Sequence, residues 1–255
     1  MLVIVSNGCQ IATKQYPFSA VEGVAPIPAG TFTMGTVDFM YAMPVHPVTF
    51  ASAFEIDKYE VTVAAYKAYA LAAPTGYTAP KDATVWSYCN WNVAGKEQHP
   101  VNCINWNQAN AYCVWAGKRL CSESEWEYAA RGLDGRKYPW GNDDPNCADR
   151  NYAVKDGCNC AGTCVVGAKS LGASPYGAMD MAGNVWEWVK DWFHEDYTGA
   201  PADGSAWEIP AGTQRIKRGG SFYYDYYSMW SWRRENGDPA YYGDYDIGTR
   251  CCRSP

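Results

Sequence analysis

The chain has few histidines, no long apolar run and no net positive charge. The 255 residues include 3 histidines. No apolar stretch reaches the roughly 18 residues that a membrane-spanning helix needs. The net charge is −6, from 21 basic and 27 acidic side chains. Because sequence-independent binding to nucleic acid requires a basic surface, we expect no nucleic-acid partner.

Aromatic residues and cysteine, in contrast, are abundant. Hydrophobic residues make up 47% of the chain and charged residues 19%, which excludes disorder. The 12 tryptophans and 20 tyrosines fit either a large aromatic core or an aromatic binding surface. The 11 cysteines, with so few histidines, favour an oxidised, exported protein of the periplasm or cell surface.

The first residues look like the end of a lipoprotein signal. The apolar run Leu2-Val-Ile-Val5 precedes Ser-Asn-Gly-Cys9, and Cys9 would carry the lipid that attaches the protein to a membrane. The run is shorter than a complete signal, so residues 1–24 are interpreted as a signal remnant, with an ordinary strand and a spare cysteine as the alternative. Residues 25–255 are predicted to form one domain.

Strands in the sequence pattern are short. Alternating apolar and polar residues indicate strands over 30–35 and 46–50. Trp186, Trp188 and Trp192 are too large to leave in water together, and we expect them in the core. A loop-rich α+β domain with little regular secondary structure follows from this pattern.

Three helices are indicated by their caps. Thr62 is expected to cap a helix over about 63–72. A second helix is predicted between Asn107, as its N-cap, and Gly117 just beyond its end. The capping-box pattern Ser122-Glu-Ser-Glu125 starts the third.

Short motifs occur along the chain in an order known from one protein family. The most specific are Gly-Lys-Arg-Leu with Glu-Trp-Glu-Tyr-Ala over 117–129, and Gly-Asn-Val-Trp-Glu-Trp over 183–188. Others are Gly30-Thr-Phe-Thr-Met-Gly35, Tyr59-Glu-Val-Thr62, Tyr138-Pro-Trp-Gly141, Arg218-Gly-Gly-Ser221 and Ile247-Gly-Thr-Arg-Cys251. Over about residues 25–253 the chain resembles the formylglycine-generating enzyme (sulfatase-modifying factor) family. The resemblance implies a single compact C-type-lectin-like domain with bound calcium.

The resemblance also implies where a catalytic site would lie. Oxidases of the family act through two cysteines just after the Gly-Gly-Ser turn, where thiolates bind soft copper(I) and exchange with the substrate cysteine. Here those positions are Tyr224 and Met229. We therefore expect no copper and no activity by the family mechanism. An oxidase acting on sulfatase cysteines through an atypical site is the alternative.

A second branch of the family implies iron held by three histidines. His46, His99 and His194 are the only histidines, and each follows a Pro-flanked or loop pattern rather than helical spacing. We expect no iron site.

The segment that replaces the catalytic pair is rich in Tyr, Asp and Ser. Its successive aromatic residues follow neither strand nor helix periodicity, so some must be exposed, and this composition is typical of binding loops. We predict a surface for an unknown protein or glycan ligand on a monomer. Its residues are Tyr223, Tyr224, Asp225, Tyr226, Tyr227, Trp230, Trp232, Tyr241, Tyr242, Asp244 and Tyr245. The alternatives are packing over an aromatic core, or a subunit contact in a structural lipoprotein.

The same segment resembles the variable region of bacterial surface proteins diversified by retroelements. In those lectin-fold proteins, fixed residues such as Gly-Gly-Ser and Ile-Gly-x-Arg hold the scaffold on either side. The Tyr, Asp and Ser composition between Ser221 and Ile247 fits that pattern. The resemblance implies a variable protein of a diversity-generating retroelement.

Two calcium sites are implied by the family motifs, because oxygen ligands of this kind suit calcium. The first would use Asp180, Gly183, Asn184 and Glu187. The second would use Asn151, Tyr152, Asp156 and Cys158.

Disulfides are expected from the cysteine positions. Cys113 and Cys251 match a family bridge, Cys121 and Cys252 flank it and are expected to pair, and Cys89 with Cys103 would close a short loop. Cys147, Cys158, Cys160 and Cys164 leave two local bridges or, alternatively, a zinc site. Cys9 is then left over for lipidation.

Overall fold

The computed structural model describes residues 4–7, 10–13, 23–145, 152–155, 161–240 and 244–254. Its helices are α1 (Val63–Ala72), α2 (Trp106–Trp115) and α3 (Glu123–Arg131), with 3-10 turns η1 (Met40–Ala42), η2 (Ser170–Gly172) and η3 (Tyr226–Met229). Its strands are β1 (Ile4–Asn7), β2 (Gln10–Thr13), β3 (Val24–Ile27), β4 (Gly30–Met34), β5 (His46–Phe50), β6 (Phe54–Asp57), β7 (Arg119–Leu120), β8 (Trp186–Trp192), β9 (Arg215–Arg218), β10 (Arg234–Gly237), β11 (Ile247–Thr249) and β12 (Cys251–Arg253). None of the helices in these segments is long and apolar enough to cross a bilayer.

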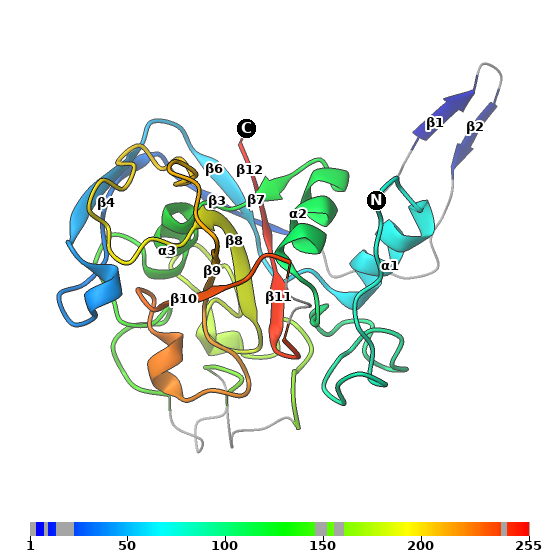
Figure 1. Ribbon diagram of the computed structural model, residues 1–255. Coiled ribbons are helices and arrows are strands. Elements are labelled where there is room, and N and C mark those ends of the chain that lie inside the picture. The colour runs from blue at the N-terminus through cyan, green and yellow to red at the C-terminus, as the bar shows by residue number, and fades with distance from the viewer. Residues whose placement is uncertain are drawn as a thin grey trace.

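Two four-stranded sheets form the body of the domain (Figure 1). The first has the order β10-β9-β8-β11, with β11 parallel to β8 and the other neighbours antiparallel. The second has the order β3-β6-β12-β7, so the last strand lies between strands from the first half of the chain. Strands β4 and β5 pair as a hairpin, as do β1 and β2.

The caps of α1 and α3 are those that the sequence predicts. The Thr62 hydroxyl accepts a hydrogen bond from the third amide of α1. At α3 the Ser122 hydroxyl accepts from the Glu125 amide, and the Glu125 carboxylate accepts from the Ser122 amide. The predicted strands over 30–35 and 46–50 are present as β4 and β5.

Helix α2 begins earlier than predicted. Its N-cap is Asn105, whose side chain accepts from the Gln108 amide while the Gln108 side chain accepts from the Asn105 amide. Asn107 therefore lies inside the first turn, and its expected capping role is wrong. Gly117 does follow the helix end, with φ 72°, a left-handed conformation that glycine adopts without strain.

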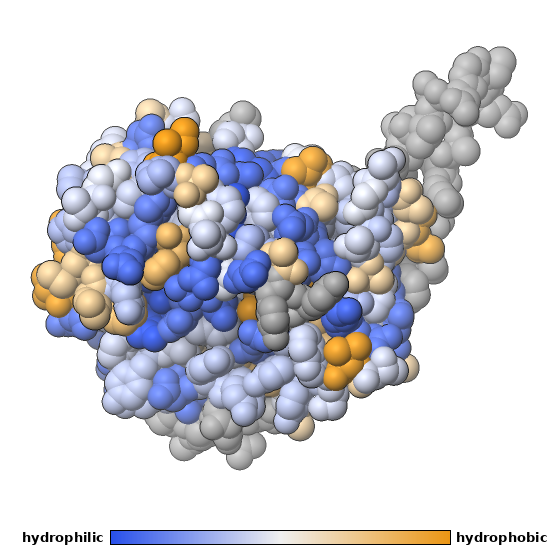
Figure 2. All heavy atoms as spheres, in the orientation of Figure 1, coloured by the Kyte–Doolittle hydropathy of each residue, from blue (hydrophilic) through white to orange (hydrophobic). Residues whose placement is uncertain are grey.

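Tryptophans fill the core beneath both sheets. Trp186 and Trp188 are each 2% exposed, and Trp126 is fully buried, as expected for bulky anchors in a loop-rich domain. Trp192 is half-buried instead, with the Arg215 guanidinium 3.4 Å from its ring centre. At the surface, Figure 2 shows a largely hydrophilic face, with apolar residues gathered at one edge over η1.

Buried ion pairs link α3 to the first sheet. Glu123 and Glu127 lie one turn apart on α3. Arg218 donates to Glu127 at 2.7 Å, and Arg131 shares that carboxylate at 2.8 Å. Arg234 donates two hydrogen bonds to Glu123 at 2.9 and 2.8 Å. Both of these carboxylates thus have a guanidinium partner, which offsets their desolvation.

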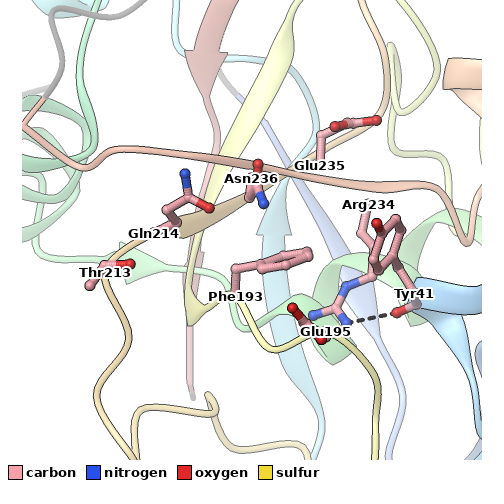
Figure 3. Close-up of a pocket in the computed structure, with 8 residues that line it drawn as sticks. All are labelled: Tyr41, Phe193, Glu195, Thr213, Gln214, Arg234, Glu235 and Asn236. Atoms are coloured by element: carbon pink, nitrogen blue, oxygen red, sulfur yellow. Dashed lines mark hydrogen bonds between the residues drawn. The ribbon is translucent and has the colours of Figure 1, made fainter.

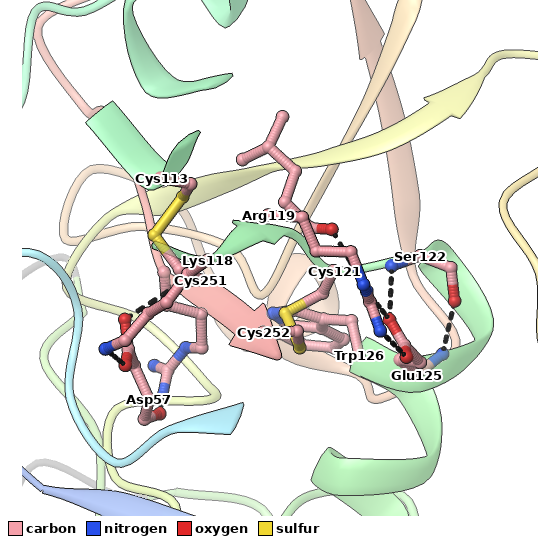
Figure 4. The surroundings of a disulfide bond; sticks show 12 residues. Asp57, Cys113, Lys118, Arg119, Cys121, Ser122, Glu125, Trp126, Cys251 and Cys252 are labelled. Carbon is pink, nitrogen blue, oxygen red and sulfur yellow. Dashed lines mark hydrogen bonds and ion pairs between the residues drawn. A yellow bond between two sulfur atoms is a disulfide. The ribbon is translucent and has the colours of Figure 1, made fainter. Parts of the chain in front are cut away.

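Three disulfides lie within the described residues. They are Cys89–Cys103, Cys113–Cys251 and Cys121–Cys252, the same three pairs that the sequence and the resemblance imply. Figure 4 shows the last two side by side, tying β12 to the end of α2 and to the segment after β7. Cys164 is also disulfide-bonded. Cys9, Cys147, Cys158 and Cys160 lie outside the described residues.

Candidate functional site

The Gly219-Gly220 turn sets the position of the aromatic segment that follows it. Gly220 has φ 73°, and a side chain there would lie 2.8 Å from the Ser228 hydroxyl and 2.9 Å from Met229 Cγ. The chain after the turn therefore folds back directly on the turn itself. Only glycine permits so close an approach with this backbone conformation.

A hydrogen bond closes the base of the same segment. The Ser221 hydroxyl donates to Asp246 Oδ2 at 2.6 Å, and both side chains are buried. The Trp186 amide donates to the Asp246 carbonyl at 2.8 Å, which fixes this end to β8. The residues on either side of the segment 222–245 are thus held together at one point of the body.

The two positions that the resemblance assigns to catalytic cysteines lie in different surroundings. Tyr224 is 46% exposed, with its ring edge-on to Trp186 at 6.0 Å. Met229 is fully buried in a small cluster with Tyr138 and Ala182. All cysteines in the described part of the chain are in disulfides, so none of them supplies a thiolate. A phenol and a buried thioether cannot replace a copper(I) bis-thiolate or exchange with a thiol.

Exposed tyrosines surround this point. Tyr223 and Tyr227 are 52% and 48% exposed, and the hydroxyl of Tyr226 donates to that of Tyr227 at 2.7 Å. The remaining predicted residues are placed as follows: Asp225 is exposed, Trp230, Asp244 and Tyr245 are half-buried, and Tyr241 and Tyr242 lie outside the described residues. We call Tyr223, Tyr224, Asp225, Tyr226, Tyr227, Trp230, Asp244 and Tyr245 the aromatic surface.

Trp232 does not belong to this surface, contrary to the expectation. It is 8% exposed and packs in the main core, where the Arg131 guanidinium lies 5.3 Å from its ring centre. The physical reason is that the chain re-enters the body just before β10, so the second tryptophan of the pair points inward.

A cavity of about 300 Å³ lies among these tyrosines. It is lined by Trp186, Lys217, Tyr224, Asp225, Tyr227, Ser228, Arg233 and Glu235. Arg233 and Glu235 form an ion pair, whereas Lys217 has no carboxylate within salt-bridge distance in the described part of the chain. The buried Trp186 Nε1 has no hydrogen-bond partner there. The Lys217 ammonium lies 5.7 Å from the Trp186 ring centre, and it is a charged donor that the cavity offers to a ligand.

The charged residues that line the cavity were not predicted from the sequence. Lys217, Arg233 and Glu235 come from β9 and from the residues at the start of β10. Successive residues of a strand point to opposite faces, so the alternation in these two strands was the available signal. Arg218 and Arg234 take the buried positions, and their neighbours face the cavity.

The first predicted calcium set does not fit a calcium shell as it is placed. Arg250 donates to both oxygens of the Glu187 carboxylate at 2.7 Å, and Trp126 Nε1 adds a third hydrogen bond. Asp180 accepts from the Gly167 amide, and Asn184 Oδ1 accepts from the Cys164 amide. Glu187 is thus already neutralised by a guanidinium.

Another carboxylate, Glu60, lies against this set. Asn184 Nδ2 donates to Glu60 at 2.6 Å. Burial, followed by the neighbouring Asp180, raises the pKa of Glu60 well above its usual value. Within the described residues, no three His, Cys, Asp or Glu side chains are grouped to hold a metal. Of the second predicted set only Tyr152 is described, since Asn151, Asp156 and Cys158 lie outside the described residues. Calcium stays a prediction of the resemblance.

The three histidines take part in separate contacts. His46 lies edge-on to Tyr197, His99 is 2.9 Å from the Thr163 hydroxyl, and His194 stacks on Trp207 at 3.7 Å.

The fold and motifs are shared with known proteins. Residues 11–255 match the family described as the sulfatase-modifying factor enzyme 1-like domain. The chain belongs to this family. This sulfatase-modifying factor homologue is 31% identical to the formylglycine-generating enzyme of Thermomonospora curvata over 294 residues, covering 95% of this chain and 92% of that enzyme. It is 41% identical to the inactive C-alpha-formylglycine-generating enzyme 2 of Bos taurus over 110 residues, covering 38% of this chain and 34% of the bovine protein.

Solved structures agree on the fold of this sulfatase-modifying factor homologue. PvdO from Pseudomonas aeruginosa has a TM-score of 0.77 and 31% identity, and the match covers 91% of this chain and 94% of PvdO. Variable protein 1 of Treponema denticola has a TM-score of 0.70 and 23% identity, covering 92% and 95%. The domain is therefore an α+β, C-type-lectin-like fold.

Proposed function

We propose that this family member is a non-catalytic, exported binding protein whose aromatic surface holds a protein or glycan ligand. The proposal rests on the chemistry of the side chains at two positions. Tyr224 and Met229 occupy the positions of the two cysteines on which family oxidation depends, and Met229 is fully buried. The described cysteines that might substitute are held in disulfides.

The relatives support loss of activity within this fold. A homologous bovine protein is itself named inactive. The disulfides also fit an oxidising compartment, where an exported protein would work.

The aromatic surface has the properties of a binding site. Tyr223, Tyr224 and Tyr227 are each about half-exposed, and tyrosine gives a large, rigid contact area at low entropic cost. The cavity beside them adds the Lys217 ammonium as a donor, with the Trp186 ring beneath it. A ligand with an apolar face and an acceptor group would suit this combination.

A peptide-oxidation assay tests the absence of catalysis. The full chain is incubated with copper, reductant, oxygen and a cysteine-containing peptide with the sulfatase motif. We expect formylglycine no faster than in a no-protein control. Turnover above that background would overturn the proposal, whatever the protein binds.

A binding experiment tests the surface itself. Ligands are selected against the immobilised chain from a displayed peptide library and a glycan array. They are then titrated against the variant Y223S/Y224S/Y227S and against L71S/L133S/L171S, which alters three equally exposed residues elsewhere. We expect the tyrosine variant to lose at least tenfold in affinity and the leucine variant to keep it. The reverse result would place the binding site elsewhere.

We also propose that residues 222–245 are diversified. Support comes from the Tyr, Asp and Ser composition and from the closed base, because the Ser221–Asp246 hydrogen bond holds the segment ends independently of its sequence. Sequencing of the neighbouring DNA tests this. A reverse transcriptase with a near-copy of these codons supports diversification, and invariance of the segment among isolates contradicts it.

Calcium stabilisation is tested by chelation. A fall in Tm with EGTA that calcium reverses would support the family's calcium sites. An unchanged Tm would agree with the hydrogen bonds by which Arg250 already occupies the Glu187 carboxylate.

A further inference from the structure

A second cleft lies on the other side of β10 from the aromatic surface. Its volume is about 480 Å³. It is lined by Tyr41, Phe193, Glu195, Thr213, Gln214, Arg234, Glu235 and Asn236 (Figure 3). Arg234 and Asn236 point to this side of β10, and Figure 3 shows Glu235 on the opposite side of the strand. The strand therefore lies between this cleft and the aromatic surface.

An aromatic ring lies at the centre of this cleft. Figure 3 shows Phe193 between the amide groups of Gln214 and Asn236 on one side and Glu195 with Tyr41 on the other. The Tyr41 and Phe193 rings are 5.9 Å apart and tilted by 59°. The two rings give the cleft an apolar wall, with the Arg234 guanidinium 5.3 Å from the Phe193 ring centre. An aromatic wall with polar groups around it is the usual arrangement of a small-molecule site.

Apart from Arg234 and Glu235, the polar side chains around these two rings make no hydrogen bonds within the described residues. In the described part of the chain, the Tyr41 hydroxyl and the side chains of Glu195, Thr213, Gln214 and Asn236 have no hydrogen-bond or ion-pair partner. Other exposed polar residues differ. Asp82 binds Thr84, and Asp203 binds Ser205, each two residues along the chain. The cleft thus gathers unused donors and acceptors at one place.

The charges of the cleft restrict the ligand. Arg234 is neutralised by two hydrogen bonds to Glu123, and it also donates to the carbonyls of Tyr41 and His194. Glu235 is paired with Arg233. Glu195 is then the one unpaired charge among the lining residues, so an anion would be repelled.

We propose that this cleft binds a pyranose sugar, either free or as the end of a glycan. Amide and hydroxyl side chains both donate and accept hydrogen bonds, as sugar hydroxyls do, and a carboxylate accepts from two hydroxyls. The apolar C–H face of the ring would lie on Phe193. The cleft is too polar for a lipid tail, and its volume accommodates a monosaccharide with one linked residue.

Saturation-transfer NMR and calorimetry with glucose, galactose, mannose and N-acetylglucosamine test the proposal on the full chain. At least one sugar should show saturation transfer and a measurable Kd. Asn236→Ala and Gln214→Ala should each weaken that Kd about tenfold, with thermal unfolding confirming that both variants fold. Glu195→Gln keeps an acceptor, so sugar affinity should change less than threefold.

A matched pair of variants separates the two sites. Tyr41→Leu alters this cleft and should abolish sugar binding, whereas Tyr223→Leu alters the aromatic surface and should leave it unchanged. Absence of saturation transfer from every sugar at millimolar concentration overturns the proposal. Two other results would also overturn it. One is a ligand whose binding is lost with Glu195→Gln, because such a ligand would be a cation. The other is a selected peptide that competes for binding only in the cleft. None of these outcomes bears on ligand binding at the aromatic surface.

Discussion

The buried centre of the domain and its aromatic surface use polar and aromatic residues in opposite ways. In the centre, the carboxylate of Glu187 accepts from Arg250 and from Trp126, and Arg218 donates to Glu127 and to three backbone carbonyls. At the surface, tyrosine hydroxyls and the Lys217 ammonium point toward solvent or a cavity. The same residue types support the fold where their interactions are made within the protein, and under the proposed function they bind a ligand where they are exposed.

The largest effect should come from the bridges that hold the centre together. Replacing all four cysteines of Cys113–Cys251 and Cys121–Cys252 by alanine should cost about 5 kcal/mol of unfolding free energy in the chain-entropy model, because they close loops of 138 and 131 residues. Removing one bridge alone should cost much less, since both close nearly the same loop. Urea unfolding measures this.

The control is the short loop closed by Cys89–Cys103, with a separation of 14 residues. Its removal should cost about 3 kcal/mol. Equal losses for the long and short loops would contradict the entropic account.

Breaking a buried ion pair should have the next largest effect. Arg218→Met leaves Glu127 with only Arg131, and such a loss typically costs about 3–5 kcal/mol. The matched surface change is Arg253→Ala, which removes an exposed ion pair to Glu55 and should leave the unfolding free energy nearly unchanged, because solvent screens the pair. Chemical denaturation of both variants compares the two regions, and similar losses would remove the distinction between them.

A smaller effect is expected at Asp191, whose carboxylate accepts from the Glu123 and Trp207 amides. Burial, followed by the nearby Glu123 carboxylate, raises the pKa of Asp191 to about 7. Because this pKa is higher in the folded state than in the unfolded chain, its contribution to stability is complete below about pH 4 and is lost as the pH rises through 7.

Asp191→Asn should flatten that pH dependence. It should also cost about 1–3 kcal/mol at low pH, because an amide has one acceptor oxygen for two N–H groups. Thermal unfolding between pH 4 and 8 checks both expectations. A slope unchanged by the substitution would assign the pH dependence to other groups.

The smallest effect on stability should be at the aromatic surface. Tyr223→Ser and Tyr227→Ser should each change unfolding free energy by less than about 0.5 kcal/mol, since both rings are about half-exposed. Ligand binding should fall in the same variants. A loss of several kcal/mol would show that these rings pack as core, the alternative interpretation of the sequence.

Features that depend on local chemistry could be predicted from the sequence. The caps at Thr62 and Ser122 need only a hydroxyl and a nearby amide. The position of α2 was missed because both Asn105 and Asn107 are capable caps, and only the reciprocal bond with Gln108 decides between them. The wrong placement of Trp232 has a similar cause, since the point where the chain re-enters the body is set by tertiary packing.

Features that depend on distant partners could not be predicted. The second cleft joins Tyr41 in η1 to Phe193 after β8 and to Asn236 in β10, and no spacing in the chain indicates that they meet. The ion pair between Glu187 and Arg250 also joins residues that are 63 positions apart in the chain.

The attachment of β12 by two adjacent cysteines has a consequence for proteolysis of the chain. Both Cys251 and Cys252 follow the aromatic segment, and their partners precede it. A cut anywhere in 222–245 would therefore yield two fragments that stay covalently joined and part on a gel only after reduction. A chain cut in this segment would keep β12 attached.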